Sequence, residues 1–216
     1  MTDVFIHSSA IVETSEIGEG THIWAFTHVM REVPIGAHCN IGDHCFIESG
    51  ATIGNQVTIK NGNMIWEGVQ LEDGVFVGPL VVFTNDLYPR SPRLPYMRNR
   101  YADRGWLKPT VIKCGASLGA GSVILAGITI GEFAMVGAGA IVNKSLPPHA
   151  LAVGTPARVR GWVCQCGQRL VFSHEAAVCA ACGLEFIKSH STIAALSASE
   201  GSPTEAAPET LAVVPR

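Results

Sequence analysis

An aliphatic residue or phenylalanine recurs at every sixth position through the first part of the chain. The positions are Ile11, Ile17, Ile23, Val29, Ile35, Ile41, Ile47, Ile53, Ile59, Ile65, Leu71, Val77 and Phe83. In a chain that is 47% hydrophobic, such a run would arise by chance with a probability of about 10⁻⁴ or less. Neither an α-helix nor an ordinary strand has this period. The pattern predicts a chain wound around a three-sided prism, with three hexapeptides in each coil and one aliphatic residue pointing inward from each face.

Two other positions of the hexapeptide support this prediction. The second position is often glycine, which suits a corner where positive φ or close backbone approach would penalise a Cβ atom; examples are Gly18, Gly36, Gly42, Gly54 and Gly78. The fifth position is small or β-branched and is expected to fill the space beside the aliphatic column. Cys39 and Cys45 occupy this position, so we predict that they pack in the core.

The repeat is interrupted once. After Phe83 its next clear member is Ile112, and the register then continues through Leu118, Ile124, Ile130, Val136 and Val142. Residues 84–110 are therefore predicted to form a loop that leaves the prism. This segment is rich in basic residues although the net charge of the protein is −3, and it contains Arg90, Arg93, Arg98, Arg100, Arg104 and Lys108. Such a cluster predicts either an anionic ligand or a solvated loop.

Four cysteines near the C-terminus have the spacing of a metal site. Cys164 and Cys166 form a C-x-C pair followed by glycine, and Cys179 and Cys182 form a C-x-x-C pair followed by glycine. Thiolate pairs on tight turns can close a tetrahedron around Zn²⁺, and four cysteine ligands leave no open position for catalysis. The spacing predicts a structural zinc ribbon; the alternative is four free cysteines or a ribbon without metal.

These patterns together predict an all-β protein built as a left-handed parallel β-helix of hexapeptide repeats, with one long loop and a small appendage. We expect the β-helix over residues 1–160 and the zinc-ribbon-like segment over 161–188. Residues 189–216 are rich in Ser, Ala, Glu, Pro and Thr, and such a composition predicts a disordered tail.

Composition narrows the classes of function. The 216 residues contain no run of the roughly 20 apolar residues needed to cross a membrane, and the N-terminal segment lacks the features of a secretory signal. We therefore expect a cytoplasmic protein that does not insert into membranes. The basic residues near the cysteines, Arg158, Arg160, Arg169 and Lys188, are too few and too scattered to predict binding of nucleic acid.

Longer motifs resemble a known family. The segments LEDGVFVGP (71–79), FTNDLYPRS (83–91), GASLGAGSVILAGITIGEFAMVGAGAIV (115–142) and VGTPARVRGWVCQCG (153–167) are similar to those of N-acetyltransferases that act on amino sugars of nucleotide sugars. The resemblance covers about residues 5–187. It is strongest to UDP-2-acetamido-3-amino-2,3-dideoxyglucuronate N-acetyltransferases, with dTDP-3-amino-3,6-dideoxyhexose 3-N-acetyltransferases as near relatives. It implies a homotrimer that uses acetyl-CoA, with active sites between subunits, in surface polysaccharide biosynthesis.

The length of one coil and the family resemblance together indicate where the catalytic region lies. Because one coil has eighteen residues, Arg31, Ser49, Glu67 and Asn85 should stack in one column about 4.8 Å apart. The resemblance implies that Asn85, Asp86 and Glu67 line the place where the sugar amine meets the thioester. We expect Asn85 and Asp86 to hold the amine, and Glu67 to orient it or accept its proton. The alternative is that Asn85 is a turn residue and Glu67 lies on a solvated face.

Binding residues are predicted on both sides of this region. His28 and Arg31 are expected at the nucleotide, and Arg90 is expected to contact the anionic substrate from the loop. The resemblance implies that acetyl-CoA lies along the upper coils. The small residues expected there are Gly119, Ala120, Gly137 and Ala138, with Lys144 and Arg158 at the phosphates; simple turn glycines are the alternative.

Two other classes of function share this fold. A metal-dependent lyase of the carbonic-anhydrase type needs three histidines that converge across a subunit interface. Here His22 and His28, like His38 and His44, are six residues apart and should lie on adjacent faces of the prism. The second alternative is a non-enzymatic scaffold whose ribbon binds nucleic acid, which the scattered basic residues disfavour. The nucleotide, UDP or dTDP, is left open, with the UDP-linked glucuronate favoured.

Overall fold

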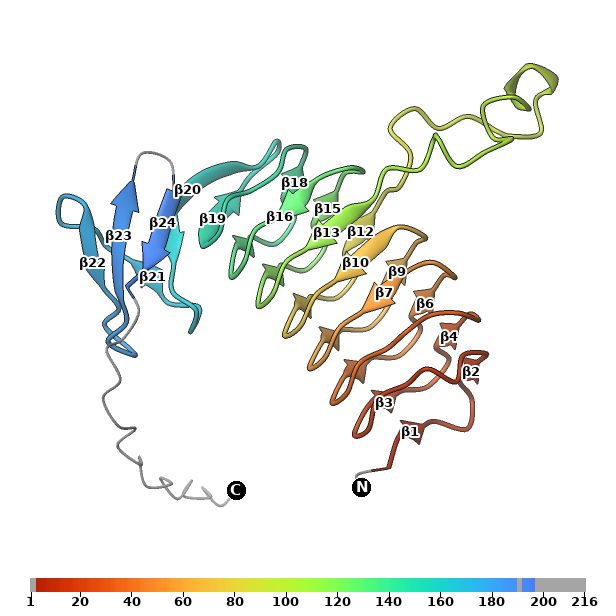
Figure 1. The fold of residues 1–216 in the computed structure, drawn as a ribbon, viewed down its shortest axis with the longest axis horizontal. Coiled ribbons are helices and arrows are strands. Elements are labelled where there is room, and N and C mark those ends of the chain that lie inside the picture. Colours follow the sequence, from red (N-terminus) through yellow and green to blue (C-terminus); the bar gives the residue numbers. More distant parts are fainter. Residues whose placement is uncertain (1–2, 190–191, 197–216) are drawn as a thin grey trace, which may run out of the picture.

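The computed structural model describes residues 3–189 and 192–196. They form a stack of three-sided coils, with a loop projecting from the side of the stack and a small sheet beyond its last coil (Figure 1). Within the stack, neighbouring strands up to β19 belong to successive coils and pair in parallel. The predicted all-β parallel helix of hexapeptide repeats with one long insertion is confirmed.

Three sheets form the faces of the prism, which we name A, B and C. Face A contains, in spatial order, β1 (Phe5–Ile6), β3 (His22–Ile23), β5 (Asn40–Ile41), β8 (Thr58–Ile59), β11 (Phe76–Val77), β14 (Ser117–Leu118), β17 (Met135–Val136), β19 (Ala150–Val153), β20 (Arg158–Val163) and β21 (Arg169–Leu170). Face B contains β2 (Ile11–Val12), β4 (His28–Val29), β6 (Phe46–Ile47), β9 (Met64–Ile65), β12 (Val82–Phe83), β15 (Val123–Ile124) and β18 (Ile141–Val142). Face C contains β7 (Thr52–Ile53), β10 (Val69–Leu71), β13 (Thr110–Ile112) and β16 (Thr129–Ile130).

The core is the aliphatic column that the six-residue period predicts. Every member of the repeat from Ile23 to Phe83, and from Ile112 to Val142, is at most 4% exposed. The two earliest members differ: Ile11, on the terminal strand of face B among the described residues, is 60% exposed, and Ile17 is only partly buried. Cys39 and Cys45 are buried beside the column, as predicted.

Close approach between coils explains the glycines at the second position of the repeat. At Gly36 an added Cβ would lie 2.5 Å from the carbonyl carbon of Gly54 in the next coil, a distance that no side chain can occupy. The left-handed backbone conformation falls two positions later in the hexapeptide, at residues such as Gly50 and Gly68, and also at the bulky Phe26 and Leu80. Glycine at the second position could be needed either for positive φ or for close backbone approach. At Gly36 the reason is close approach.

The insertion leaves the prism between β12 and β13, so the prediction of a loop over residues 84–110 is correct to within one residue at its C-terminal end. An isolated antiparallel bridge between Asp86 and Leu107 closes its base. The loop contains the short 3-10 helix η1 (Pro95–Met97). No helix in the described ranges has the length and apolar character to cross a bilayer.

The C-terminal end differs from the predicted division of the chain. The expected boundary between residues 160 and 161 falls inside β20, which pairs antiparallel with both β19 and β21. A second sheet follows, formed by β22 (Ala176–Val178), β23 (Glu185–Ser189) and β24 (Thr192–Ala195). The expectation of disorder from residue 189 is wrong for β24, because its apolar Ile193 is buried and the strand pairs with β23. The remainder of the predicted tail, 190–191 and 197–216, lies outside the described residues.

Candidate active site

The predicted polar column exists at the corner between faces B and C. The Ser49 hydroxyl donates to the carbonyl oxygen of Arg31 at 2.7 Å, and the Asn85 side-chain amide donates to the carbonyl oxygen of Glu67 at 3.3 Å. The strand register of face B, continued into this corner, aligns Asn85 with Ala126 and then with Lys144. The corner therefore presents Glu67 and Asn85 where the loop begins, with Lys144 two coils further along the stack.

Glu67 is held from two sides. Its backbone N–H donates to a carboxylate oxygen of Glu48 at 2.8 Å. Its own carboxylate forms an ion pair with the guanidinium of Arg104 from the loop. The Glu67 side chain is only 17% exposed, whereas that of Arg104 is 78% exposed. An exposed cation from the loop therefore covers a largely buried carboxylate.

Asn85 marks the point where the loop leaves the prism. Its backbone carbonyl accepts from the N–H of Lys108, the residue at which the loop returns, at 2.9 Å. Its side chain is partly buried and bonds to the coil below through Glu67. The residue thus fixes both the exit of the loop and one polar group at its mouth.

Asp86 is committed to the loop. Its carboxylate, in a side chain that is 8% exposed, accepts from the N–H of Tyr88 at 2.8 Å, the hydroxyl of Tyr101 at 2.9 Å and the guanidinium of Arg100 at 2.5 Å. Burial raises the pKa of Asp86, but the hydrogen bonds from Tyr88 and Tyr101 and the charge of Arg100 outweigh burial and leave the pKa below its ordinary value. These contacts suit a residue that positions the loop.

Two of the predicted substrate residues, His28 and Arg31, share the carboxylate of Glu13, while Arg90 lies on the loop. The Nε2 atom of His28, on β4, lies 2.8 Å from Oε1 of Glu13, and the Nε atom of Arg31 lies 3.7 Å from Oε2 of the same carboxylate. The hydrogen bond with His28 lowers the pKa of Glu13, with further lowering from the nearby charges, against the raising effect of burial. Glu13 was missed in the sequence, although the fifteen-residue spacing to His28 brings the two to neighbouring coils. Arg90 lies exposed on the loop, and its guanidinium donates to the carbonyl of Pro89.

Four of the predicted cofactor residues, Gly119, Ala120, Gly137 and Ala138, lie at a different corner, between faces A and B, whereas Lys144 lies at the corner of the polar column. Gly119 and Gly137 stack there on successive coils, and an added Cβ at Gly119 would be 2.4 Å from the backbone nitrogen of Ala138. Ala120 and Ala138 beside them are exposed. Close packing of the coils accounts for these glycines by itself. Arg158 is exposed on β20, and its guanidinium donates to the carbonyl of Ala157.

Face B separates the two corners and is apolar on its outer side. Phe46, Met64 and Val82 are in register on β6, β9 and β12 and point away from the core; Met64 is 48% and Val82 50% exposed. A cavity of about 250 Å³ lies on this face; it is lined by Gly62, Met64, Trp66, Leu80, Val81, Val82 and Phe83. The outer side of face B thus carries an apolar strip between the predicted cofactor corner and the polar column.

The histidines have the placement that the sequence predicts. His22 lies on face A and His28 on face B, and neither belongs to the Glu67–Asn85 column. His149 is buried, with its ring stacked on Phe133 and its edge against Phe186.

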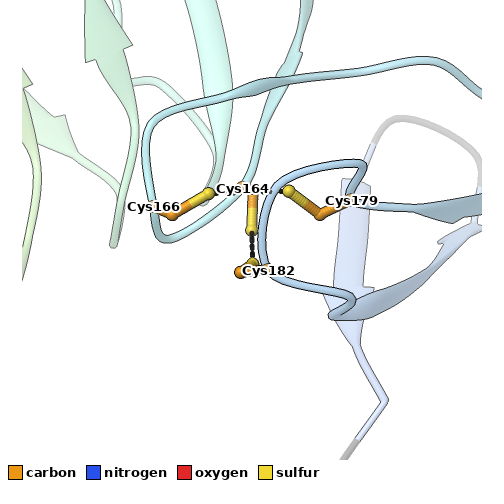
Figure 2. A group of neighbouring side chains, drawn as sticks. All are labelled: Cys164, Cys166, Cys179 and Cys182. Atoms are coloured by element: carbon orange, nitrogen blue, oxygen red, sulfur yellow. Dashed lines mark hydrogen bonds between the residues drawn. The ribbon is translucent and has the colours of Figure 1, made fainter. Parts of the chain in front are cut away.

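A second candidate site is the four-cysteine cluster. Cys164 and Cys166 come from the turn between β20 and β21, and Cys179 and Cys182 from the turn between β22 and β23. All four Sγ atoms lie within 4.8 Å of one another, and the four side chains converge (Figure 2). Burial raises the pKa of the Cys164 thiol to about 12, whereas backbone N–H groups of Cys182 and Ala181 lower that of Cys179 to about 6.

Comparison with known proteins identifies the repeats on both sides of the loop. Residues 14–49 match the bacterial transferase hexapeptide (six repeats), and residues 109–144 match the hexapeptide repeat of succinyl-transferase. Both matched segments therefore consist of hexapeptide repeats. Each matched segment spans about two coils, so the two matches agree with the interruption of the repeat by the loop.

Curated relatives of this hexapeptide-repeat protein are acetyltransferases. It is 54% identical over 77 residues to the dTDP-3-amino-3,6-dideoxy-alpha-D-galactopyranose 3-N-acetyltransferase of Aneurinibacillus thermoaerophilus, covering 36% of this chain and 40% of that protein. It is 34% identical over 86 residues to the galactoside O-acetyltransferase of Lactococcus lactis subsp. lactis, covering 40% and 39%. The matches thus span about 40% of the length of these relatives. The expected resemblance to nucleotide-sugar N-acetyltransferases is confirmed.

Similar solved structures include the acetyltransferase domain of PglB from Neisseria gonorrhoeae FA1090. It has a TM-score of 0.48 and 19% identity, over 73% of this chain and 57% of that one. A variant of perosamine N-acetyltransferase from Caulobacter crescentus, in complex with CoA and GDP-perosamine, has a TM-score of 0.37 and 27% identity, over 74% and 57%.

Proposed function

We propose that this hexapeptide-repeat protein transfers an acetyl group from acetyl-CoA to the amino group of a nucleotide-linked amino sugar. The observation that carries the proposal is the 54% identity to a dTDP-3-amino sugar 3-N-acetyltransferase. The polar column gives the proposal its residues, because Glu67 and Asn85 stand together where a basic loop begins.

The same relative bears on the choice of nucleotide sugar. The sequence motifs alone favour UDP-2-acetamido-3-amino-2,3-dideoxyglucuronate, but the relative is named for a dTDP-linked 3-amino-3,6-dideoxyhexose. We therefore put a dTDP-3-amino-3,6-dideoxyhexose first. The UDP-linked glucuronate is the second candidate, because its family shares the GW-C-x-C-G segment that begins at Gly161.

The proposed reaction needs placement more than strong base catalysis. The sugar nitrogen attacks the thioester carbonyl carbon, the C–N bond forms, the C–S bond breaks, and coenzyme A leaves as a thiolate. The nitrogen gives up one proton, either to Glu67 or to the departing thiolate. In this proposal Asn85 and Glu67 contact the amine, while Asp86 positions the loop rather than the substrate. Arg104, now paired with Glu67, is free to turn toward the phosphates because its side chain is largely exposed.

The separation of the two corners supports a composite site. The proposed cofactor residues Gly119 and Ala138 lie between faces A and B, while Glu67 and Asn85 lie between faces B and C. An apolar strip lies between them. If the strip packs against a neighbouring chain, the cofactor corner of one subunit meets the polar column of another. We propose the homotrimer implied by the family resemblance as the assembly that achieves this.

Acetyl-CoA is a co-substrate in this proposal, and no step involves the four-cysteine cluster. Zinc at that cluster is proposed as a separate and purely structural centre.

An assay of the purified chain with acetyl-CoA and a panel of dTDP- and UDP-linked 3-amino sugars tests the proposal. The readouts are release of the coenzyme A thiol and the acetylated mass of the product. The dTDP-3-amino-3,6-dideoxyhexose is expected to have the highest kcat/KM. A higher value for the UDP-linked glucuronate would reverse the order of the two candidates, and absence of turnover with every amino sugar would contradict the proposed activity.

A further inference from the structure

The four cysteines lie on two turns that belong to different sheets. The turn of Cys164 and Cys166 connects β20 to β21, which continue face A beyond the last coil. The turn of Cys179 and Cys182 connects β22 to β23 of the separate three-stranded sheet. Any ion bound by all four thiolates would therefore join the small sheet to the end of the prism.

The two turns have matching backbone geometry. The N–H of Cys164 donates to the carbonyl of Gln168, and that of Cys179 donates to the carbonyl of Leu184, both at 2.8 Å. In each turn the glycine after the second cysteine donates back to the carbonyl of the first at 2.9 Å, Gly167 to Cys164 and Gly183 to Cys179. Both glycines have positive φ, 85° and 75°. Such turns direct two sulfurs toward the same point.

The sulfur positions fit a single ion. The Sγ atoms of Cys164 and Cys182 are 3.4 Å apart, and those of Cys166 and Cys179 are 3.5 Å apart. Zinc bonds of about 2.3 Å at tetrahedral angles place the sulfurs about 3.8 Å apart, whereas a disulfide needs about 2.05 Å. Each of these short distances runs from a sulfur of one turn to a sulfur of the other turn, as the dashed line between Cys164 and Cys182 in Figure 2 shows. All four thiols therefore surround one centre rather than forming two isolated pairs.

The small sheet needs such a centre. Its buried apolar side chains in the described residues are few: Ala177, Phe186 and Ile193. Phe186 contacts the ring of His149 from the last coil at 5.2 Å between centroids, which gives the sheet one aromatic anchor on the prism. A segment of this size rarely buries enough surface to stay folded without a metal or a covalent link.

We propose that Cys164, Cys166, Cys179 and Cys182 bind one Zn²⁺ that fastens the three-stranded sheet to the C-terminal end of the β-helix. The ion has four thiolate ligands and no open position, so it is structural. One cysteine of each turn is buried and one is exposed, so the ion can enter from the solvent side. The prism has its own continuous core and remains folded when the ion is removed.

Metal content of the reduced, full-length chain gives the first test. Elemental analysis is expected to find about one zinc per chain after reconstitution with Zn²⁺. Cobalt in its place is expected to give the visible bands of a tetrahedral thiolate complex. The double variant Cys179→Ser/Cys182→Ser should lose the metal, while the matched control Cys114→Ser, a cysteine outside the cluster, should retain it. Iron in place of zinc, zinc well below stoichiometry, or disulfides among the four cysteines in the native protein would each overturn the proposal.

Limited trypsin digestion tests the fastening. Removing zinc from the wild-type chain with a chelator is expected to speed cleavage after Arg169 or Lys188 by about tenfold or more, because local opening controls cleavage there. Cleavage in the loop after Arg90 or Arg93 should keep its rate and serves as an internal control. Adding zinc back should restore protection, which keeps the test decisive even if the double variant fails to fold. Equal cleavage rates with and without bound zinc would show that the ion does not hold the three-stranded sheet on the β-helix.

Discussion

At the scale of single residues, Asn85 combines two roles. Its backbone holds the return of the loop at Lys108, and its side chain bonds to the coil below at Glu67. Replacing Asn85 by Ala removes only the side-chain amide. We expect kcat to fall by about tenfold or more, the loss typical of a misplaced reacting group, with the oligomer intact. Steady-state kinetics measures kcat, and light scattering measures the mass of the oligomer. Asn61→Ala, an exposed asparagine at a corner between faces A and B, is the control, and unchanged turnover in Asn85→Ala would contradict the assigned role.

His28 lies two coils below Glu67, and its ring bonds to Glu13 and contacts the edge of Phe46. A residue at this distance from the thioester can act on nucleotide binding but not on the chemical step. His28→Asn should therefore raise KM for the nucleotide sugar several-fold and leave kcat within about twofold, the pattern of a lost binding contact. Kinetics at saturating acetyl-CoA separate the two parameters. A fall in kcat with KM unchanged would instead point to a histidine base.

At the scale of elements, one buried carboxylate joins several parts of the insertion loop. Asp86 accepts from Arg100 and Tyr101 across the base of the loop. Asp86→Ala removes these two bonds and the one from the N–H of Tyr88, and it leaves the Arg100 charge without its carboxylate partner, at a local cost of about 1–3 kcal/mol. We expect faster hydrogen exchange across residues 87–106, a raised KM for the nucleotide sugar and an unchanged melting transition of the prism. Asp103→Ala, whose carboxylate contacts only the backbone N–H of Gly105 among the described residues, is the control. Unchanged exchange in Asp86→Ala would contradict this account of the loop.

The loop also shows where prediction from sequence ends. The aliphatic period determines which residues face inward, because each hexapeptide repeats the geometry of the last; hence the column from Ile23 to Val142 and the stacking of Glu67 on Asn85 were predictable. The pairing of Glu67 with Arg104 was not, since it depends on how a long stretch without any repeat folds. The strand around Ile193 was missed for a similar reason: its order comes from pairing with β23, not from its own composition.

The same period could have separated the two corners. Gly119 follows a strand of face A, whereas Glu67 and Asn85 follow strands of face B. Counting hexapeptides across the insertion places them on opposite sides of face B. The proposed cofactor and amine positions therefore cannot meet within one prism unless a ligand spans the width of that face.

At the scale of the whole molecule, the proposed composite site predicts that activity depends on assembly. Face B is the apolar outer surface between the two corners, while outward positions of face C include the polar Thr52, Gln70 and Thr129. A charge placed on face B would have to be desolvated in any interface there, at a cost of several kcal/mol unless it found a partner. Assembly should therefore fail when face B is charged but tolerate the same charge on face C.

Met64→Lys tests this dependence, because Met64 is 48% exposed at the centre of the apolar strip. Light scattering should find about 69 kDa for the wild type, three times the 22.9 kDa chain, and about 23 kDa for the variant. Acetyl transfer should fall by at least about a hundredfold in the variant, since each composite site loses one of its two corners. Gln70→Lys, an exposed position on face C, should keep both the larger mass and the activity. A monomeric Met64→Lys variant with full activity would show that one prism holds the whole site, and a trimeric variant would place the interface elsewhere.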